Sequence, residues 1–266
     1  MNILDKIIAK KREEVAEAKA SRSVAELERM AGFGRKPLSS FDSLSKAGAS
    51  GIIAEFKRRS PSKGDINVTA SATEVTSGYS AAGASVLSVL TDESFFGGGL
   101  PYMREARAAN PNTPILRKDF MIDEYQFIEA KAEGADLVLL IAAALKPEET
   151  KEFARFTQSL GMQVLLEVHN AQELDAHLNE YVNLVGVNNR DLTTFTTSVQ
   201  TSYDLAERIP NEFLKVSESG INDASTIAGL KEVGYQGFLI GEYFMRQPNP
   251  AEACDKLIQD VNSITV

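Results

Sequence analysis

The stretch GIIAEFK (Gly51–Lys57) shows the pattern that decides the fold. It begins with small and apolar residues and ends with two charged ones, Glu55 and Lys57, around Phe56. A short apolar run of this kind is typical of a parallel strand that is covered on both faces. Because side chains alternate along a strand, Glu55 and Lys57 share one face and Phe56 takes the other.

Seven similar runs follow along the chain, separated by longer segments of mixed polarity. They are Ala84–Leu90, Pro114–Lys118, Asp136–Ile141, Gln163–Glu167, Leu184–Asn188, Phe213–Ser217 and Gly237–Gly241. The runs start roughly every 27 residues, close to the spacing that eight strand–helix units need in a chain of about 250 residues. We therefore predict an α/β fold, a (β/α)8 TIM barrel, as a single domain over residues 1–266. An open doubly wound sheet is less well supported, because no glycine-rich dinucleotide fingerprint follows the first run.

Residues 1–45 are predicted to form a helical extension that packs on the barrel. Apolar residues recur there at helical spacing among charged ones, at Ile3, Leu4, Ile7, Ile8 and Val15. A second, short helix is predicted near Val24–Met30, with Ser23 as its N-cap. Glycines and a proline then interrupt the helical pattern before the first strand.

The composition narrows the class of protein. A formal net charge of -9 argues against nucleic acid or an anionic membrane as the main partner, although a local site can still bind a small anion. One cysteine, Cys254, allows no intrachain disulfide, and one cysteine with two histidines gives no zinc cluster without several carboxylates. No secretory signal or membrane-spanning apolar run is present, so we expect a cytoplasmic protein, either a monomer or a weak homodimer.

Charged and polar residues recur where the apolar runs end. They are Glu55, Lys57, Lys118, Glu167, Asn188, Arg190, Glu218, Ser219 and Glu242. The active site of a TIM barrel lies at the carboxyl ends of its strands, so we expect these groups to converge on one mouth. Such convergence is costly unless the charges are paired, and it is typical of sites with shifted pKa values. A purely structural ion pair between Glu55 and Lys57 at the rim is the alternative.

Two glycines near the end of the barrel indicate an anion site. Gly220 follows Ser219 after the seventh run, and Gly241 precedes Glu242 after the eighth. Barrels often bind phosphate at these two loops, where small residues let backbone N–H groups approach an oxyanion. The sequence therefore predicts a phosphate contact at this side of the mouth.

Other loop residues leave alternatives open. The polar loop Ser60–Asp65 is either a mobile lid over an anionic ligand or a solvated loop. Phe96 stands before three glycines, which suggests a substrate contact, whereas Phe120 can equally pack beneath its own loop. His169 follows the fifth run, but a lone histidine there is more often a hydrogen-bonding loop residue than a catalytic one.

The segment IAEFKRRSPSKG (Ile53–Gly64) resembles the signature of the indole-3-glycerol phosphate synthase family. Further segments resemble the same family in the same order: Ser88–Asp92, Phe95–Gly97, Leu116–Phe120, Leu166–His169, Gly186–Leu192, Ser217–Ile221 and Leu239–Glu242. The resemblance extends over the whole chain. It implies an enzyme of tryptophan biosynthesis that converts 1-(2-carboxyphenylamino)-1-deoxyribulose 5-phosphate into indole-3-glycerol phosphate, releasing CO₂ and water. It implies no metal and no other cofactor.

The resemblance also implies roles for four charged residues. Lys118 would be the general acid at the substrate carbonyl. Lys57 would hold the substrate carboxylate and protonate the departing hydroxyl, and Glu55 would orient Lys57. Glu167 would stabilise the positive charge that develops on the amine nitrogen and act as an acid or base. We also expect the two lysines to lower each other's pKa, with Glu55 and Glu167 opposing this, so that one lysine becomes a better general acid.

The remaining contacts are assigned by the same resemblance. Asn188 and Ser219 would position hydroxyl and anthranilate groups and complete the catalytic set. Substrate binding is assigned to Ser60, Val89, Phe96, Phe120, Arg190 and Glu218, and phosphate binding to Gly220, Gly241 and Glu242. Val89, Phe96 and Phe120 would form apolar walls for the anthranilate ring.

Two other functions stay open from the sequence alone. A phosphate-binding barrel enzyme of the phosphoribosylanthranilate isomerase type would favour a Cys/Asp acid–base pair, yet Cys254 lies in the terminal helix, far from any strand end. A non-catalytic barrel subunit would have lost some polar strand ends, yet all the positions that match the family are filled.

Overall fold

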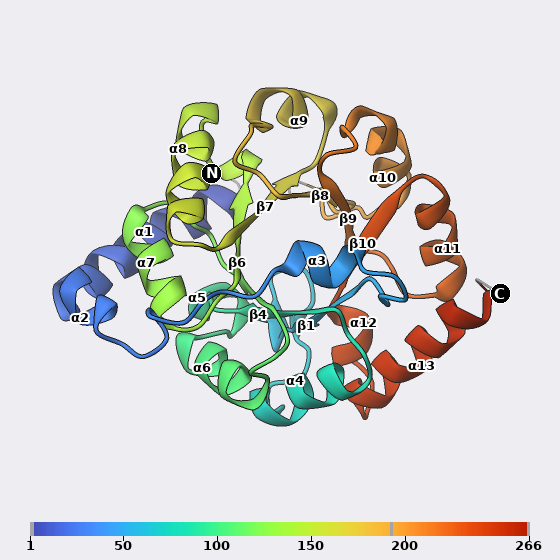
Figure 1. Cartoon of the computed structure of the whole chain (residues 1–266), viewed down its shortest axis with the longest axis horizontal. Coiled ribbons are helices and arrows are strands. Elements are labelled where there is room, and N and C mark those ends of the chain that lie inside the picture. The colour runs from blue at the N-terminus through green and yellow to red at the C-terminus, as the bar shows by residue number, and fades with distance from the viewer. Residues whose placement is uncertain (1–2, 192–193, 265–266) are drawn as a thin grey trace.

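The computed structural model describes residues 3–191 and 194–264, which form a closed barrel of parallel strands with helices packed around it (Figure 1). The barrel strands are β1 (Ile52–Phe56), β4 (Val86–Leu90), β5 (Ile115–Lys118), β6 (Leu137–Ile141), β7 (Gln163–Val168), β8 (Leu184–Asn188), β9 (Leu214–Glu218) and β10 (Tyr235–Ile240). They follow chain order around the ring, and β10 closes it by pairing with β1. The prediction of a (β/α)8 barrel is confirmed. Leu192, the last residue of one family-like segment, lies outside the described residues.

Each strand overlaps the apolar run predicted for it, and the differences are confined to the ends. At β10 the strand begins at Tyr235 rather than at Gly237. The pairing with β9 shifts register between these two residues, and Gln236 between them is exposed. This irregularity interrupts the apolar pattern, so the first two residues of the strand were not recognised in the sequence.

Alternating strand side chains fill two apolar layers. In β1, Ile53 points into the barrel, whereas Ile52 and Ala54 pack outward beneath the helices. The inner layer contains Ile53, Val86, Leu116, Leu137, Leu139, Leu165, Leu184, Leu214, Val216 and Leu239. This alternation decides which residue at each strand end faces the mouth of the barrel.

Eight longer helices surround the barrel strands and cover their outer faces. They are α4 (Ala72–Ala81), α6 (Leu100–Ala109), α7 (Glu124–Ala132), α8 (Pro147–Ser159), α9 (Ala171–His177), α10 (Gln200–Leu205), α11 (Ala224–Glu232) and α13 (Pro250–Ile264). Side-chain oxygens of Asp123, Asn170 and Asp223 accept hydrogen bonds from the first turns of α7, α9 and α11. These caps satisfy backbone donors that a helix leaves free at its start.

The N-terminal extension forms three helices, α1 (Ile3–Ser21), α2 (Val24–Glu28) and α3 (Ser40–Ser45). Ser23 caps α2 in a reciprocal arrangement with Glu26, as the sequence predicted. Leu44 of α3 joins the inner core, and α3 contacts β4 and β10 (Figure 1). Helix α1 instead contributes side chains to a pocket at the carboxyl ends of the strands.

The loop after β1 contains a short antiparallel hairpin that the sequence did not predict. Its strands are β2 (Arg59–Ser60) and β3 (Gly64–Asp65). Arg59 Nε donates to Asp65 Oδ1 at 2.7 Å across the hairpin. The loop between these strands is therefore shaped by local pairing.

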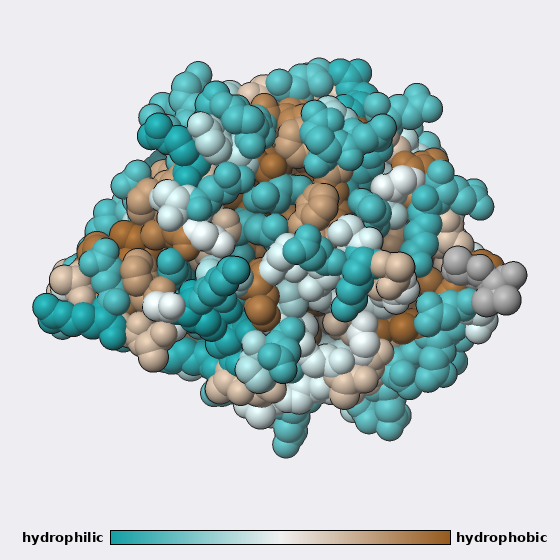
Figure 2. All heavy atoms as spheres, viewed as in Figure 1, coloured by the Kyte–Doolittle hydropathy of each residue, from teal (hydrophilic) through white to brown (hydrophobic). Residues whose placement is uncertain are grey.

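Short helical turns occupy two of the other loops at the mouth. They are α5 (Glu93–Phe96) after β4 and α12 (Glu242–Met245) after β10. Figure 2 shows one face of the molecule, on which hydrophilic residues dominate and hydrophobic ones appear in small groups between them. None of the described helices combines the length and apolarity that a membrane span needs.

Candidate active site

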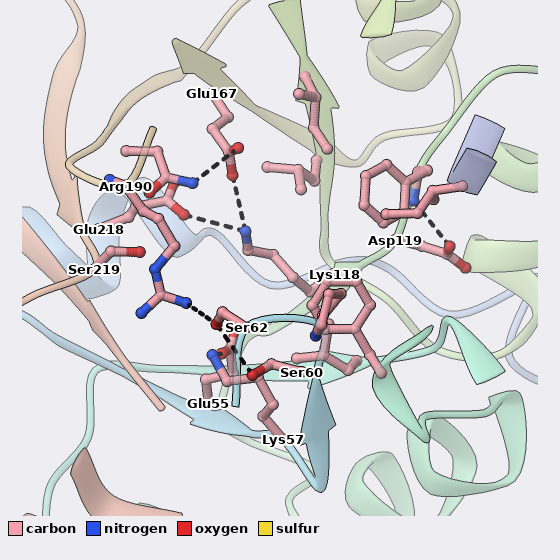
Figure 3. A pocket seen from close by; sticks show the side chains of 18 of the residues that line it. Glu55, Lys57, Ser60, Ser62, Lys118, Asp119, Glu167, Arg190, Glu218 and Ser219 are labelled. Carbon is pink, nitrogen blue, oxygen red and sulfur yellow. Dashed lines mark hydrogen bonds and ion pairs between the residues drawn. The ribbon is translucent and has the colours of Figure 1, made fainter. Parts of the chain in front are cut away.

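One pocket lies at the carboxyl ends of the strands and collects residues that are far apart in the sequence (Figure 3). The predicted site residues that line it are Glu55, Lys57, Ser60, Phe96, Lys118, Phe120, Glu167, Asn188, Arg190, Glu218 and Ser219. Every residue predicted for catalysis thus lies around a single cavity. Most of those predicted for substrate binding do so as well.

Val89 is the exception among the residues predicted as apolar walls. It is fully buried in the outer layer beneath the helices, and its neighbour Leu90 lines the pocket. The reason is the alternation of β4, in which Ser88 reaches Glu55 inside the barrel. Leu90 shares the face of Ser88, and Val89 takes the opposite one.

Lys118 is the centre of the charged cluster. Its Nζ lies 2.9 Å from Oε2 of Glu167 and 3.1 Å from Oε2 of Glu218. Asn188 Nδ2 donates to Oε1 of Glu167 at 3.1 Å, so Glu167 is held from two sides. Figure 3 shows Lys118 pointing toward both carboxylates, whereas Asp119 points to the other side of the strand end.

This cluster changes the expected electrostatics of the lysine. Burial alone would lower the pKa of Lys118, but the charges of Glu167, Glu218 and Glu55 outweigh burial and raise it well above its usual range. The expectation that a neighbouring lysine depresses the Lys118 pKa is therefore wrong. The lysine stays protonated at neutral pH because it faces carboxylates.

The two carboxylates beside Lys118 differ from each other. Burial would raise the pKa of Glu167, but Lys118 and His169 lower it below its ordinary value. Burial raises the pKa of Glu218, and repulsion from Glu167 and Glu55 adds to this against the opposing charge of Lys118. When two carboxylates share one cation, their pKa values commonly diverge in this way. One group stays ionised, and the other is ready to hold a proton.

Glu55 and Lys57 form a second charged pair in the same pocket. Lys57 Nζ lies 2.8 Å from Oε1 of Glu55, and Ser88 Oγ donates to Oε2 at 3.4 Å. Glu55 is buried, whereas the Lys57 side chain is 15% exposed and reaches the cavity. The two residues thus form an ion pair at the rim of the barrel and also line the pocket.

Comparisons with known proteins agree with this geometry. The family model described as "Indole-3-glycerol phosphate synthase" matches residues 4–257. A curated protein of that name from Bacteroides thetaiotaomicron is 48% identical over 98% of this chain and 99% of its own length. Another, from Burkholderia cenocepacia, is 44% identical over 94% of this chain and 97% of its own length. The chain belongs to the indole-3-glycerol phosphate synthase family.

Solved structures with low sequence identity share the fold. Tryptophan synthase subunit alpha from Legionella pneumophila has a TM-score of 0.61 at 17% identity, covering 85% of this chain and 98% of that one. 3-Hexulose-6-phosphate synthase from Salmonella typhimurium has a TM-score of 0.63 at 12% identity, covering 80% of this chain and 99% of that one. At such identities the likeness extends to the barrel architecture alone.

In this member of the indole-3-glycerol phosphate synthase family, the apolar side of the pocket combines aromatic rings with helix α1. The rings of Phe96 and Phe120 lie 6.0 Å apart between centroids. Ile3, Leu4 and Ile7 of α1 also line the cavity. Sequence reasoning missed these three residues, although the apolar stripe of α1 indicated that some surface must cover it.

Arg190 connects the hairpin of the first loop to the end of the barrel. Its Nη1 donates to Ser62 Oγ at 2.9 Å, and its Nη2 lies 3.2 Å from Oε2 of Glu242. Lys63 Nζ lies 3.8 Å from the other oxygen of Glu242. Ser62, which the sequence did not single out, therefore joins the predicted residues Arg190 and Glu242 over one edge of the mouth. Figure 3 shows the contact between Ser62 and Arg190.

The predicted phosphate residues surround an adjoining cavity. Gly220, Gly241 and Glu242 line it together with Ser219 and Arg246. Ser219 and Gly220 adopt positive φ angles of 68° and 76°, so the turn after β9 is left-handed at two consecutive residues. Consecutive backbone N–H groups in such turns form concavities that suit anions.

A buried lysine of α1 was also missed by sequence reasoning. Lys11 Nζ lies 2.7 Å from Glu14, 2.9 Å from Asp92 and 2.9 Å from Asp119. Within residues 3–191 and 194–264, no group of three His, Cys, Asp or Glu side chains is arranged to hold a metal ion. The charged residues at the mouth pair with one another.

Proposed function

We propose that this chain catalyses the reaction for which its family is named, in the pocket around Lys118. The substrate would be 1-(2-carboxyphenylamino)-1-deoxyribulose 5-phosphate, and the products indole-3-glycerol phosphate, CO₂ and water. The observation that carries the proposal is the position of Lys118 Nζ between Glu167 and Glu218, in the same pocket as the Glu55–Lys57 pair. A protonated amine beside an apolar wall suits a substrate in which a ketone is joined to an aromatic ring through an amine nitrogen and a methylene carbon.

Lys118 acts as the general acid in the first step. The ring carbon that bears the carboxylate attacks the ketone carbon, and the Lys118 ammonium protonates the carbonyl oxygen as the new bond forms. Because Glu167 and Glu218 keep Lys118 charged, it supplies both a proton and a positive charge at neutral pH. The pocket also holds the two ends of a flexible chain together, which removes part of the entropic cost of ring closure.

Lys57 and Glu55 act at the carboxylate side. The Lys57 ammonium binds the substrate carboxylate until the carbon–carbon bond breaks and CO₂ leaves, with the bonding electrons returning to the ring. Lys57 then protonates the hydroxyl group that departs as water. Glu55 keeps the ammonium in place through the 2.8 Å contact with Nζ.

Glu167 serves the amine nitrogen. Its carboxylate stabilises the positive charge that develops there. It then accepts the proton that the methylene carbon beside the nitrogen loses as the carbon–carbon double bond of the new five-membered ring forms. Asn188 holds Oε1 of Glu167. Glu218, with its raised pKa, shares Lys118 and contacts the substrate.

The remaining contacts bind the two ends of the substrate. Phe96 and Phe120, with the apolar residues of α1, enclose the anthranilate ring. The left-handed turn at Ser219–Gly220 and the backbone near Gly241 bind the phosphate. Ser60 and Arg190 close the edge between these regions.

The isomerase alternative has less support. Cys254 is buried in α13, and burial, with a smaller effect of Asp255, raises the pKa of its thiol to about 12. Such a thiol is a poor acid or base near neutral pH. Cys254 also does not line the pocket that contains Lys118.

The test is to incubate the purified protein with the carboxyphenylamino-deoxyribulose phosphate and to follow indole fluorescence and CO₂ release together. We expect both signals to appear in equal amounts. An isomerase would produce neither from this substrate, and a non-catalytic barrel would bind without turnover. Absence of both signals with a folded protein would contradict the proposal.

We also propose that the protein works in the cytoplasm as a monomer or weak homodimer, without a nucleic-acid partner. The net charge of -9 disfavours a polyanionic partner. The face drawn in Figure 2 has no broad hydrophobic area of the kind that stable dimers bury. Sedimentation of the protein over a range of concentrations checks the oligomeric state.

A further inference from the structure

His169 lies directly behind the catalytic cluster. It follows β7, and its side chain is 11% exposed. It does not line the pocket, yet its Nε2 lies 3.5 Å from Oε1 of Glu167. This nitrogen is buried and makes no hydrogen bond to any part of the chain that the structure describes. A buried polar nitrogen that points at a functional carboxylate calls for an explanation.

Glu173 decides which ring nitrogen of His169 carries hydrogen. Glu173 Oε2 lies 3.1 Å from Nδ1 and accepts the backbone N–H of His169 at 2.8 Å. Asn170 Nδ2 donates to the other oxygen at 2.9 Å, so the carboxylate is held firmly at the start of α9. Because an ionised carboxylate only accepts hydrogen bonds, Nδ1 must be the protonated nitrogen.

The neutral form of this histidine is therefore unfavourable. With hydrogen on Nδ1, a neutral ring turns the lone pair of Nε2 toward the negative oxygen of Glu167. The protonated ring turns an N–H toward it instead. Protonation of Nε2 therefore replaces a repulsion between Nε2 and the Glu167 oxygen with an attraction at the same distance.

The surrounding charges favour the same form. The negative charges of Glu167 of β7, Glu173 of α9 and Glu218 of β9 all act on the ring, and Lys118 of β5 pairs with two of these carboxylates, Glu167 and Glu218. Burial lowers the pKa of His169, but the hydrogen bond to Glu173 and the three negative charges outweigh burial and raise it above the ordinary value.

We propose that His169 is a positioning residue that, as an imidazolium, holds Oε1 of Glu167 from behind while Lys118 holds Oε2. Loss of the Nε2 proton as the pH rises releases Glu167 from one side and lowers kcat. The inference rests on the proposed role of Glu167 as the group that serves the amine nitrogen. It adds a pH dependence that is separate from that of Glu218, whose pKa is raised to about 7, and from that of Lys118, whose pKa lies well above the ordinary range.

Three variants separate this role from a structural one. His169→Gln keeps a neutral donor near the position of Nε2, so we expect kcat to stay near the wild-type value and to lose the part of its decline with rising pH that His169 causes, while the part that Glu218 causes remains. His169→Asn keeps a polar group near Glu173 but places nothing against Glu167, so kcat should fall about tenfold at all pH values. Glu173→Gln keeps one oxygen acceptor for Nδ1 and the backbone N–H but removes the charge, so the decline that His169 causes should begin at lower pH.

The titration itself can be read without substrate. The chain has two histidines, and the pKa of the other, His177, is lowered by burial despite the charges of Glu173 and Glu148. In an NMR titration of the imidazole C–H signals, we expect one histidine above and one below the ordinary value. His169→Gln assigns the higher one, and Glu173→Gln should lower its midpoint.

The outcomes decide between the alternatives. A pH profile of kcat in His169→Gln that matches the wild-type profile would overturn the proposal, as would a His169 midpoint at or below the ordinary histidine value. An equal loss of kcat in all three variants with an unchanged pH profile would assign His169 a structural role only. If the wild-type protein forms no indole product at all, the proposed function fails, while the NMR titration still tests the charge on His169.

Discussion

Lys11 Nζ lies 2.9 Å from Oδ1 of Asp119, the residue that directly follows Lys118 in the chain. It lies at the same distance from Oδ2 of Asp92, and both carboxylates are buried. The lysine belongs to α1, whose apolar side chains line the pocket. One buried cation therefore connects this apolar wall to the end of the strand that carries Lys118.

Replacing Lys11 by Met should loosen α1 and destabilise the fold. The change leaves the buried Asp92 without this cation and Asp119 with Arg117 as its remaining cation, which costs on the order of 3 kcal/mol of unfolding free energy. We expect KM to rise more than kcat falls, because the apolar wall contributes binding. Urea unfolding and steady-state kinetics measure both effects. The control is Lys10→Met, since Lys10 is exposed and pairs only with Glu13, and equal effects of the two variants would contradict the role of Lys11.

Lys118→Ala should lower kcat by on the order of 100-fold or more while the fold survives. One of the two carboxylates that Lys118 now neutralises can take up a proton, which limits the cost to stability. Lys118→Arg keeps the charge but donates no proton, so it should restore KM more than kcat. Indole fluorescence gives both constants, and circular dichroism monitors the fold. Near-normal turnover of Lys118→Ala would remove this residue from the acid role.

Gly241 has no room for a side chain. A Cβ at this position would lie 2.5 Å from Oε1 of Glu55, the atom that holds Lys57. Gly241→Ala should therefore displace the Glu55 carboxylate, lower kcat and raise KM together. Gly34→Ala is the matched control, because a Cβ there meets no atom within 4 Å. Unchanged kinetics in Gly241→Ala would mean that the Glu55–Lys57 pair adjusts freely.

Gly241→Asp tests the phosphate contact rather than the ion pair. It adds a negative charge beside the turn at Ser219–Gly220 and should mainly weaken binding of the phosphate end. We expect a rise in KM well beyond that of Gly241→Ala. Inorganic phosphate, used as a competitive inhibitor, reports on the same contact, and an unchanged inhibition constant and KM would count against it.

Glu218 should make the stability depend on pH in a defined direction. Burial and the neighbouring carboxylates Glu167 and Glu55 raise its pKa to about 7, against the effect of Lys118. Because this folded-state pKa exceeds the unfolded value of about 4.5, the folded protein binds the proton more tightly. The free energy of unfolding therefore falls as the pH rises from about 4.5 to about 7.

Glu218→Gln removes this dependence. Relative to wild type, the variant should gain on the order of 3 kcal/mol of stability over that pH interval. Urea unfolding at several pH values measures the difference. A constant difference between the two proteins from pH 4.5 to 8 would show that Glu218 does not titrate there.

The barrel could be predicted because each strand is buried on both faces and so appears as an apolar run. The site could be predicted because barrel strands deliver their terminal residues to one mouth, which brought Lys57, Lys118 and Glu167 together. The in–out alternation was applied to Glu55 and Lys57, where it held. The same alternation, applied to β4, would have predicted that Leu90 rather than Val89 lines the pocket.

Other features depend on contacts that no local pattern contains. The apolar stripe of α1 is visible in the sequence, but the part of the barrel that it covers is set by the buried contacts of Lys11 with Asp92 and Asp119. The pKa of Lys118 was mispredicted because the effect of each charge depends on distance. Glu218 proved to be a direct partner at 3.1 Å, a contact that strand order alone does not give.

The floor of the pocket is made by Leu139, Ile141 and Leu239, which belong to the inner core of the barrel. Dissolved salt weakens exposed pairs such as Lys10–Glu13, because counter-ions gather within about 8 Å at physiological ionic strength. No such ions can approach Lys118 through an apolar floor. The barrel interior thus shields the cluster from below, and burial leaves its charges less screened by salt than those of an exposed pair.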